Sequence, residues 1–454
     1  MNDLLLSAIS GILLVLAFPR FGVYPLAYVA AVPLLLAVRR SRTILDSAKC
    51  GMLCGAIFFG GVLFWINTLS RWAGPWAYVS WISLAVFQAL FLAAFAGSAK
   101  YISKYKLDII LIPFLWAVIE WIRSLGPFGV TGGGLGYSQA GFIPVLQLAS
   151  IAGIYGISFL AVMVNEAVLE FVADRNIRVL TAALLILIMV IGFGQLRISA
   201  FRDTGREINI AVIQGNIPQD EKMDFRSMYR IVDDQEILSW KALPSRPDII
   251  IWPETAVTTY LFDSAVIRPQ IAEMVKKGRA YYLIGTPYRE GDKTYNSVAA
   301  LSKNGDYMGR YDKQRLVPFG EYLPLRPLFY PILRNISLFE KDYDSGKVPK
   351  IIDLGIAKVG AVICFESTFP YMVRDKIRKG AQFILVATND AWFFDSAAPY
   401  QHIEAAQVRA AENGVYVVQA ANTGVSAIID PLGRVVKRSN VGQTAVLTGK
   451  IFVH

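Results

Sequence analysis

Three side chains that can act together in covalent catalysis occur in the second half of the chain. Glu254 stands in IIWPETAV, Lys313 in GRYDKQRLVPFGEYLP and Cys364 in GAVICFESTFP, each at or just past the end of an expected strand. Active sites of α/β sheets are usually assembled where strands end. A cysteine thiol can attack a carbonyl carbon if a base takes its proton and a donor holds the resulting oxyanion. This set of residues therefore predicts acyl chemistry through a thioester.

A carboxylate is the expected base for Cys364, because His402 is the only histidine that precedes the last residue. We expect Glu254 to take and return the thiol proton. Lys313 would supply a fixed positive charge that favours the thiolate and stabilises an oxyanion. The backbone N–H of Phe365, at a strand-to-helix turn, would be a second oxyanion donor. Each residue alone could equally be a packing residue, a cap or a solvated charge, so the prediction depends on their combination.

The elements that must position these residues form an expected α/β domain over residues 206–454. Buried strands are predicted at 208–216, 248–254, 281–287, 358–366, 382–390 and 415–423. Helices are predicted between them at 225–243, 264–279, 368–379 and 399–413. A closing strand is expected within 443–454. This alternation is typical of sheets whose faces are covered by helices.

The first part of the chain, residues 1–197, predicts a membrane domain of about seven helices. The chain is 54% hydrophobic and only 18% charged, and its long uncharged runs precede residue 197. About 20 apolar residues make a helix that crosses the hydrocarbon core. Spans are expected near 4–18, 22–38, 50–69, 76–98, 107–123, 143–171 and 179–196. The first run has no small-residue cleavage site, so we interpret it as a retained span and not as a signal peptide.

The basic residues of the short loops predict the orientation of these spans. With the N-terminus inside, the inner loops hold nine Lys and Arg residues and the outer loops hold three. Such an excess marks the cytoplasmic side. Seven spans then deliver the catalytic domain and the C-terminus to the outer face, which is the periplasm of a bacterium. Because much of the net charge of +10 serves topology, we expect no nucleic-acid surface.

Other polar and reactive residues of the membrane domain have structural interpretations. Cys50 and Cys54 lie four apart in an apolar run, as small packing residues of a helix do. Glu120 and Arg123 lie three apart on one helix face and predict an ion pair. The Gly-rich stretch 124–142 is expected to line a lipid entry site or to form a re-entrant connector.

Seven segments carry a resemblance to a known family. They are GYSQ at 136–139, QGNIPQ at 214–219, IIWPET at 250–255, YNS at 295–297, KQRLVPFGEYLP at 313–324, ICFES at 363–367 and NDAWF at 389–393. With multiple spans ahead of them, the chain resembles the carbon-nitrogen hydrolase, or nitrilase-like, superfamily, and within it the apolipoprotein N-acyltransferase family of bacterial inner membranes. The resemblance implies an αββα sandwich with a Glu-Lys-Cys triad.

The resemblance also implies roles for individual residues. Glu254 becomes the general base, Lys313 the oxyanion-stabilising lysine and Cys364 the nucleophile. Glu321 becomes a second essential carboxylate, and Glu366 a supporting acid near the nucleophile.

Two residues depart from the family's pattern. Met223 stands where the family often has a tryptophan, which concerns lipid contact, and Phe365 lacks the hydroxyl of the tyrosine that commonly follows the nucleophile. The family usually closes with another membrane helix, and residues 425–454 hold no apolar run of that length.

The implied reaction moves a fatty acyl chain from a membrane phospholipid to the α-amine of the diacylglyceryl-cysteine of apolipoproteins, with neither metal nor organic cofactor. Two alternatives remain open at this point. One is a membrane-anchored amidase or nitrilase that hydrolyses a small amide with the same triad. The other is a transporter or sensor whose outer domain only binds a ligand.

Overall fold

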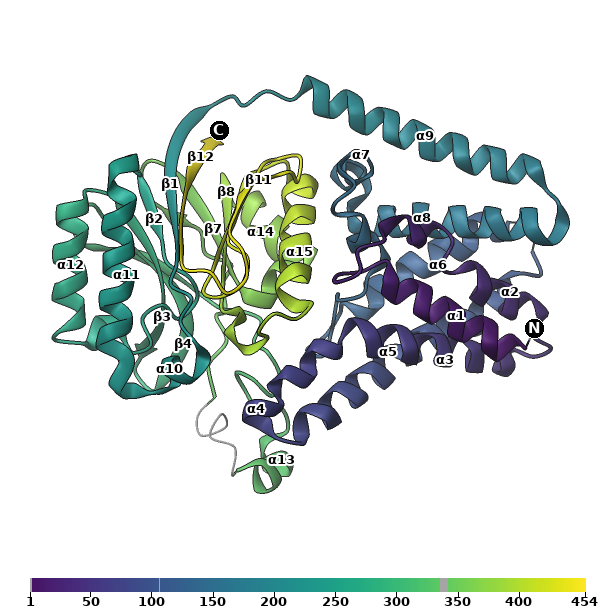
Figure 1. Cartoon of the computed structure of the whole chain (residues 1–454), viewed down its shortest axis with the longest axis horizontal. Helices are drawn as coiled ribbons and strands as arrows, with labels where there is room; N and C mark the ends of the chain where they lie inside the picture. Colours follow the sequence, from purple (N-terminus) through teal and green to yellow (C-terminus); the bar gives the residue numbers. More distant parts are fainter. Residues whose placement is uncertain (1, 106, 335–341) are drawn as a thin grey trace. The chain divides into compact units, whose positions relative to one another are not determined.

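The computed structural model describes residues 2–105, 107–334 and 342–454. The chain divides into two compact units, Met1–Phe201 and Arg202–His454, and Figure 1 shows the elements of each. The first unit is helical and the second combines helices with two sheets. They are described in turn.

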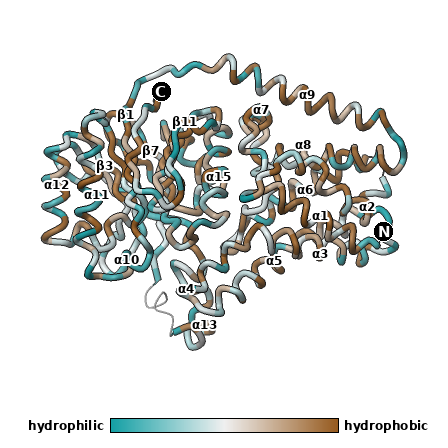
Figure 2. The backbone as a smooth tube through the Cα atoms, in the orientation of Figure 1, coloured by the Kyte–Doolittle hydropathy of each residue, from teal (hydrophilic) through white to brown (hydrophobic). Residues whose placement is uncertain are grey.

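Four helices of the first unit, among the residues that the structure describes, are long and apolar enough to cross a bilayer. They are α3 (Ile44–Val62), α5 (Trp76–Ile102), α8 (Ala149–Asp174) and α9 (Ile177–Ala200). The other helices are α1 (Asp3–Leu16), α2 (Val32–Arg40), α4 (Ser70–Ala73), α6 (Asp108–Arg123) and α7 (Ile143–Leu146). Figure 2 shows α9 as predominantly hydrophobic along its length. The number of crossings stays a prediction.

The second predicted span, 22–38, is not one continuous helix. It is divided into a 3-10 turn, Tyr24–Tyr28, and the helix α2, which begins at Val32. A proline occupies the first turn of each piece. Proline favours the start of a helix and cannot donate a hydrogen bond within one, so these residues begin two short elements where a single span was expected.

Small residues bring α3 and α5 into close contact. A Cβ added at Gly51 would lie 2.3 Å from the carbonyl oxygen of Leu92, and one at Gly55 would lie 2.8 Å from Cα of Ala89. Glycines four apart allow such an approach between apolar helices. Cys50 and Cys54, their neighbours on α3, are buried free thiols, in agreement with packing residues.

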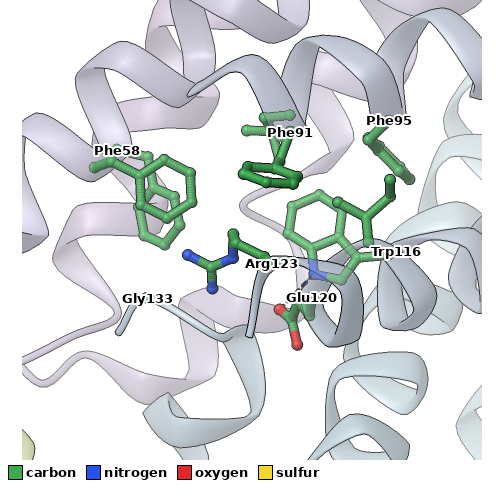
Figure 3. A pocket seen from close by; sticks show the side chains of 10 residues that line it. Phe58, Phe91, Phe95, Trp116, Glu120, Arg123 and Gly133 are labelled. Atoms are coloured by element: carbon green, nitrogen blue, oxygen red, sulfur yellow. Dashed lines mark hydrogen bonds between the residues drawn. The ribbon is translucent and has the colours of Figure 1, made fainter. Parts of the chain in front are cut away.

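Glu120 and Arg123 of α6 are both buried, but they do not pair directly as predicted. The Glu120 carboxylate accepts hydrogen bonds from Trp116 Nε1 at 2.7 Å, Leu135 N at 2.7 Å and Ser158 Oγ at 2.6 Å. Arg123 instead donates to Gln88 and to the carbonyl of Gly132. Figure 3 shows the two side chains pointing in different directions at a small apolar pocket. The two charged groups therefore hold the middle of the Gly-rich segment that follows α6, at Gly132 and Leu135.

The second unit contains two six-stranded sheets. The first has the order β12-β1-β2-β3-β4-β5 and the second the order β11-β10-β9-β8-β7-β6. The strands of the first sheet are β1 (Arg206–Gln214), β2 (Ile249–Ile251), β3 (Tyr281–Glu290), β4 (Lys293–Leu301), β5 (Tyr307–Asp312) and β12 (Ala445–Val453). Those of the second are β6 (Ile352–Asp353), β7 (Lys358–Ile363), β8 (Phe383–Thr388), β9 (Val417–Ala421), β10 (Ala427–Ile429) and β11 (Val435–Arg438). The predicted closing strand is β12, which pairs antiparallel with β1.

Buried apolar side chains on both faces of the strands join four layers. Ile210 and Val212 of β1 belong to a core shared with the second sheet, whereas Ala211 and Ile213 belong to a core on the opposite face. That outer core includes residues of α11 (Met228–Ala242) and α12 (Ile267–Gly278), and α14 (Pro370–Arg378) and α15 (Ala398–Asn413) cover the second sheet (Figure 1). Each fully buried aliphatic side chain contributes about 1.5–3 kcal/mol. The predicted αββα sandwich is confirmed.

Candidate active site

The triad predicted from the sequence is assembled from both sheets of the second unit. Glu254 follows β2 and Lys313 follows β5, both in the first sheet, whereas Cys364 follows β7 in the second. Glu254 and Lys313 are buried. The face-to-face packing of the sheets thus brings together residues that lie 51 to 110 positions apart in the sequence.

The Glu254 carboxylate is held by three donors from separate segments. Asn296 Nδ2 donates to Oε1 at 2.7 Å, and the backbone N–H of Asn389 donates to Oε2 at 2.8 Å. Lys313 Nζ lies 3.4 Å from Oε1. The side chain of Lys222 also donates to the Glu254 backbone carbonyl at 3.1 Å. These contacts fix the orientation that a general base requires.

Lys313 is an ammonium group between two carboxylates. Its Nζ lies 2.9 Å from Glu321 Oε1, closer than to Glu254. Burial disfavours the charged form, but Glu321 and Glu254 outweigh that effect and raise the pKa of Lys313. The lysine is therefore a permanent cation within the site, as the predicted oxyanion role requires.

Glu321 lies beside the triad, and the turn that follows Lys313 presents it there. Its Oε1 also accepts from Asn296 Nδ2 at 2.9 Å, and its Oε2 accepts from the backbone N–H of Val317 at 2.8 Å. Asn296 thus bridges Glu321 and Glu254. Both carboxylates and the lysine belong to one hydrogen-bonded cluster.

Cys364 occupies a strained turn, where β7 ends and the 3-10 helix Cys364–Thr368 begins. Its φ of +54° is uncommon for a residue with a side chain and costs of order 1–3 kcal/mol. The predicted strand 358–366 therefore ends at Ile363, three residues early. The strand thus ends just before the predicted nucleophile, and the oxyanion role of the Phe365 N–H stays a prediction.

Lys313 favours the thiolate form of Cys364, as expected, but its effect is outweighed. Burial and the negative charge of Glu254 raise the pKa of the Cys364 thiol, and the opposing effect of Lys313 is smaller. The cysteine is thus a thiol before reaction. A base is needed to activate it, and this need strengthens the assignment of that role to Glu254.

Glu366 stabilises the backbone around the site by accepting hydrogen bonds. Its carboxylate accepts hydrogen bonds from the Tyr311 hydroxyl and from the backbone N–H groups of Gln314, Arg315 and Ile363, at distances of 2.7 to 3.0 Å. Burial raises the pKa of Glu366, and its hydrogen bonds and the nearby Lys376 oppose that shift. This single side chain connects the end of β7 to the segment that carries Lys313.

The two parts of the chain match family models of different kinds. Residues 209–453 match the model of the carbon-nitrogen hydrolases, and residues 10–167 match that of the apolipoprotein N-acyltransferase N-terminal domain. An amidase of the nitrilase superfamily from Nesterenkonia is a similar solved structure, with 17% identity and a TM-score of 0.43 over 56% of this chain and 92% of that one.

Whole-length relatives decide the family. The apolipoprotein N-acyltransferase of Geobacter metallireducens is 33% identical, covering 99% of this chain and 89% of that protein. That of Aquifex aeolicus is 31% identical and covers 98% of both chains. The chain belongs to the apolipoprotein N-acyltransferase family. Membership confirms N-acyl transfer as the predicted class of reaction, carried out by a membrane protein, and it favours neither a small-amide hydrolase nor a non-catalytic binder.

Two residues predicted for the site, Phe365 and Met223, lie outside the hydrogen-bonded cluster. The Phe365 ring packs edge-on against Phe369, with centroids 4.9 Å apart, and the Arg315 guanidinium lies 3.8 Å from the Phe369 ring. Met223 ends the short helix α10 (Gln219–Met223) and is 44% exposed. A contact of Met223 with lipid stays a prediction.

Sequence reasoning missed several residues of the site. Asn296 and Asn389 lie within the matched segments YNS and NDAWF, but no role was expected for their amides. Burial lowers the pKa of Lys222 to about 7, with Glu254 opposing the shift. An asparagine within a matched motif that follows or ends a predicted strand was the available signal.

Proposed function

We propose that the protein transfers a fatty acyl chain from a membrane phospholipid, through a thioester on Cys364, to the α-amine of the N-terminal diacylglyceryl-cysteine of apolipoproteins. The observation that carries this proposal is the placement of Cys364 on a strained turn, in the electrostatic range of Glu254 and Lys313. The catalytic domain, residues 206–454, would face the periplasm at the inner membrane of a bacterium. Residues 1–197 would hold it there through about seven spans.

In the first half-reaction, Glu254 takes the proton of the Cys364 thiol. The thiolate forms a bond to the ester carbonyl carbon, and the negative charge moves to the carbonyl oxygen. Lys313 and the Phe365 N–H stabilise that oxyanion. When the intermediate collapses, the C–O bond breaks, and protonated Glu254 gives its proton to the departing lysophospholipid oxygen. The acyl chain remains on sulfur.

In the second half-reaction, the neutral α-amine of the acceptor attacks the thioester carbon. Glu254 takes a proton from the attacking nitrogen and returns it to sulfur as the C–S bond breaks. The product is an amide and the free thiol is restored, which makes the reaction a ping-pong transfer. An amide is more stable than a thioester, so no activated donor beyond the phospholipid is required.

Mass spectrometry of the protein after incubation with phospholipid vesicles tests the proposal. We expect a fatty acyl adduct on the peptide that contains Cys364, released by neutral hydroxylamine as a thioester is. The Cys54→Ala variant is a matched control that removes a different buried thiol and should retain the adduct. A stable adduct on another residue, or transfer with no adduct at all in a donor-only incubation, would contradict the thioester mechanism.

A further inference from the structure

A hydroxyl connects the sulfur of Cys364 to a buried carboxylate that the mechanism does not use. β7 and β8 run parallel with Ile363 opposite Ala387, so the next residues, Cys364 and Thr388, lie side by side. The Thr388 hydroxyl lowers the pKa of the Cys364 thiol, against the larger opposing effects of burial and Glu254. Its Oγ1 is also 3.2 Å from Asp390 Oδ1, to which it can donate. Asp390 is therefore one side chain away from the nucleophile.

Asp390 is paired with the only histidine inside the chain. Its side chain is fully buried, and its Oδ1 lies 2.7 Å from Nδ1 of His402 on α15. The site is tight, because a Cβ added at Gly424 would lie 2.0 Å from Asp390 Oδ2. Asp390 and His402 therefore form a fixed pair, here called the buried pair.

Three titratable groups at the ends of other strands interact with the buried pair. They are Glu254 after β2, Lys313 after β5 and Cys364 after β7. Burial lowers the pKa of His402, but its carboxylate partner Asp390 outweighs this effect and the net shift is upward. The charge of Asp390 also contributes to the raised pKa of the Cys364 thiol. An unpaired Asp390 would thus oppose thiolate formation.

We propose that protonated His402 compensates the charge of Asp390 and thereby makes it easier for Cys364 to lose its proton. His402 acts through Asp390 and Thr388 and is a positioning residue, since it does not contact the reacting atoms. The inference rests on Cys364 being the nucleophile of the proposed function. It assigns a role to His402, which was not expected to be the general base.

The variant His402→Asn removes the charge but keeps a polar side chain at this position. The asparagine amide can donate a hydrogen bond, as an imidazole N–H can, but it carries no positive charge. The measurement is the rate at which iodoacetamide alkylates Cys364 across a range of pH, followed by the mass of the Cys364 peptide. We expect the profile to move to higher pH, with alkylation at least about tenfold slower at pH 7, the equivalent of one pKa unit.

Two further variants make the result decisive. His402→Asn with Asp390→Asn removes both charges and should return the alkylation profile toward that of the unmodified protein. His454→Asn is the matched control, because it changes the chain's other histidine, which is exposed and lies beside Thr204. An unchanged profile for His402→Asn, with or without a loss of acyl transfer, would overturn the proposal and leave His402 a packing residue.

The test also covers a failure of folding. If His402→Asn does not fold, Asp390→Asn alone should show a profile that is unchanged or moved to lower pH, and a move to higher pH would overturn the proposal. Alkylation does not require acyl transfer, so its pH profile tests the buried pair independently of the proposed function. An acyl adduct found elsewhere than Cys364 would instead contradict the proposed function.

Discussion

At the scale of single residues, the Lys313 ammonium group contacts two carboxylates, and one of them is closer than the other. Glu321 is the closer partner, at 2.9 Å against 3.4 Å for Glu254. Glu254 is therefore the carboxylate that can accept a proton without leaving Lys313 unpaired in a buried site. We therefore propose Glu254 as the reactive acid-base group and Glu321 as the counter-ion of Lys313.

Substitutions of the proposed nucleophile and of the proposed base should differ in their effect on acyl-enzyme formation. Cys364→Ala should prevent formation of the acyl-enzyme, because no sulfur remains to hold the acyl chain. Glu254→Gln should slow its formation by at least about 10²-fold, since an amide cannot accept the proton of a thiol that burial keeps neutral. The rate of adduct formation in single-turnover mass spectrometry measures both. Equal rates in Glu254→Gln and the unmodified protein would remove Glu254 from the mechanism.

The counter-ion role of Glu321 predicts a loss of activity without a loss of fold. Glu321→Gln keeps a group that can accept from Val317 N, but it leaves Glu254 as the only carboxylate partner of Lys313. A more tightly paired Glu254 is a poorer base, so we expect about a tenfold or larger fall in acyl transfer, about 1.4 kcal/mol in activation free energy. The protein should remain folded and inserted in the membrane. Full activity would reduce Glu321 to a turn residue.

The sequence predicted the residues of this site whose chemistry is distinctive and missed those whose role is geometric. A cysteine after a buried strand, with a glutamate and a lysine at other strand ends, already points to thioester chemistry. Asn296 and Asn389 contribute only directed N–H groups to Glu254, and the partners lie 42 and 135 residues apart in the chain. The pairing of β2, β3 and β4 within the first sheet brings Asn296 to Glu254, and the packing of the two sheets brings Asn389 there.

At the scale of elements, Glu366 holds two segments that come from different sheets. The carboxylate accepts from the backbone of Gln314 and Arg315 after β5 and from Ile363 at the end of β7. Glu366→Gln replaces one accepting oxygen with a donor, so at least one buried N–H loses its partner at a cost of about 1–3 kcal/mol. We expect faster hydrogen exchange at these amides and weaker acyl transfer. Unchanged exchange would show that Glu366 does not brace the segment.

Most of the predicted strands are buried on both faces, but the largely buried β4 was missed. β1, β7, β8 and β9 have continuous apolar runs, and each was expected within a few residues of its observed bounds. β5 lies at a sheet edge, is largely exposed, and has a bulge in its pairing with β4, so its sequence, YMGRYD, gives no clear periodicity. β2 is shorter than predicted, because Pro253 has no N–H to extend the ladder.

At the scale of the whole molecule, contacts inside the first unit bring together three helix ends that were predicted to face the cytoplasm. Arg39, at the end of α2, forms ion pairs with Glu170 and Asp174, at the end of α8. Lys100, near the end of α5, donates to the carbonyl of Arg39 at 3.0 Å. These three ends therefore lie on one side of the helical unit, as the predicted order of spans requires.

The arrangement of basic residues predicts which side that is. Of the three basic residues counted on the outer side, Arg123 is buried and bound to Gln88 and Gly132, so it does not act as a loop charge. The excess of basic residues on the inner side is therefore larger than nine against three. The side that holds Arg39 should then be cytoplasmic, and α9, which starts from that side at Ile177, should deliver the catalytic domain to the other. Alkaline phosphatase joined after His454 should be active in the periplasm, and the same enzyme inserted between α8 and α9 should be inactive. Fluorescence of a cytoplasmic reporter joined after His454 would mean that the number of spans or their orientation is wrong.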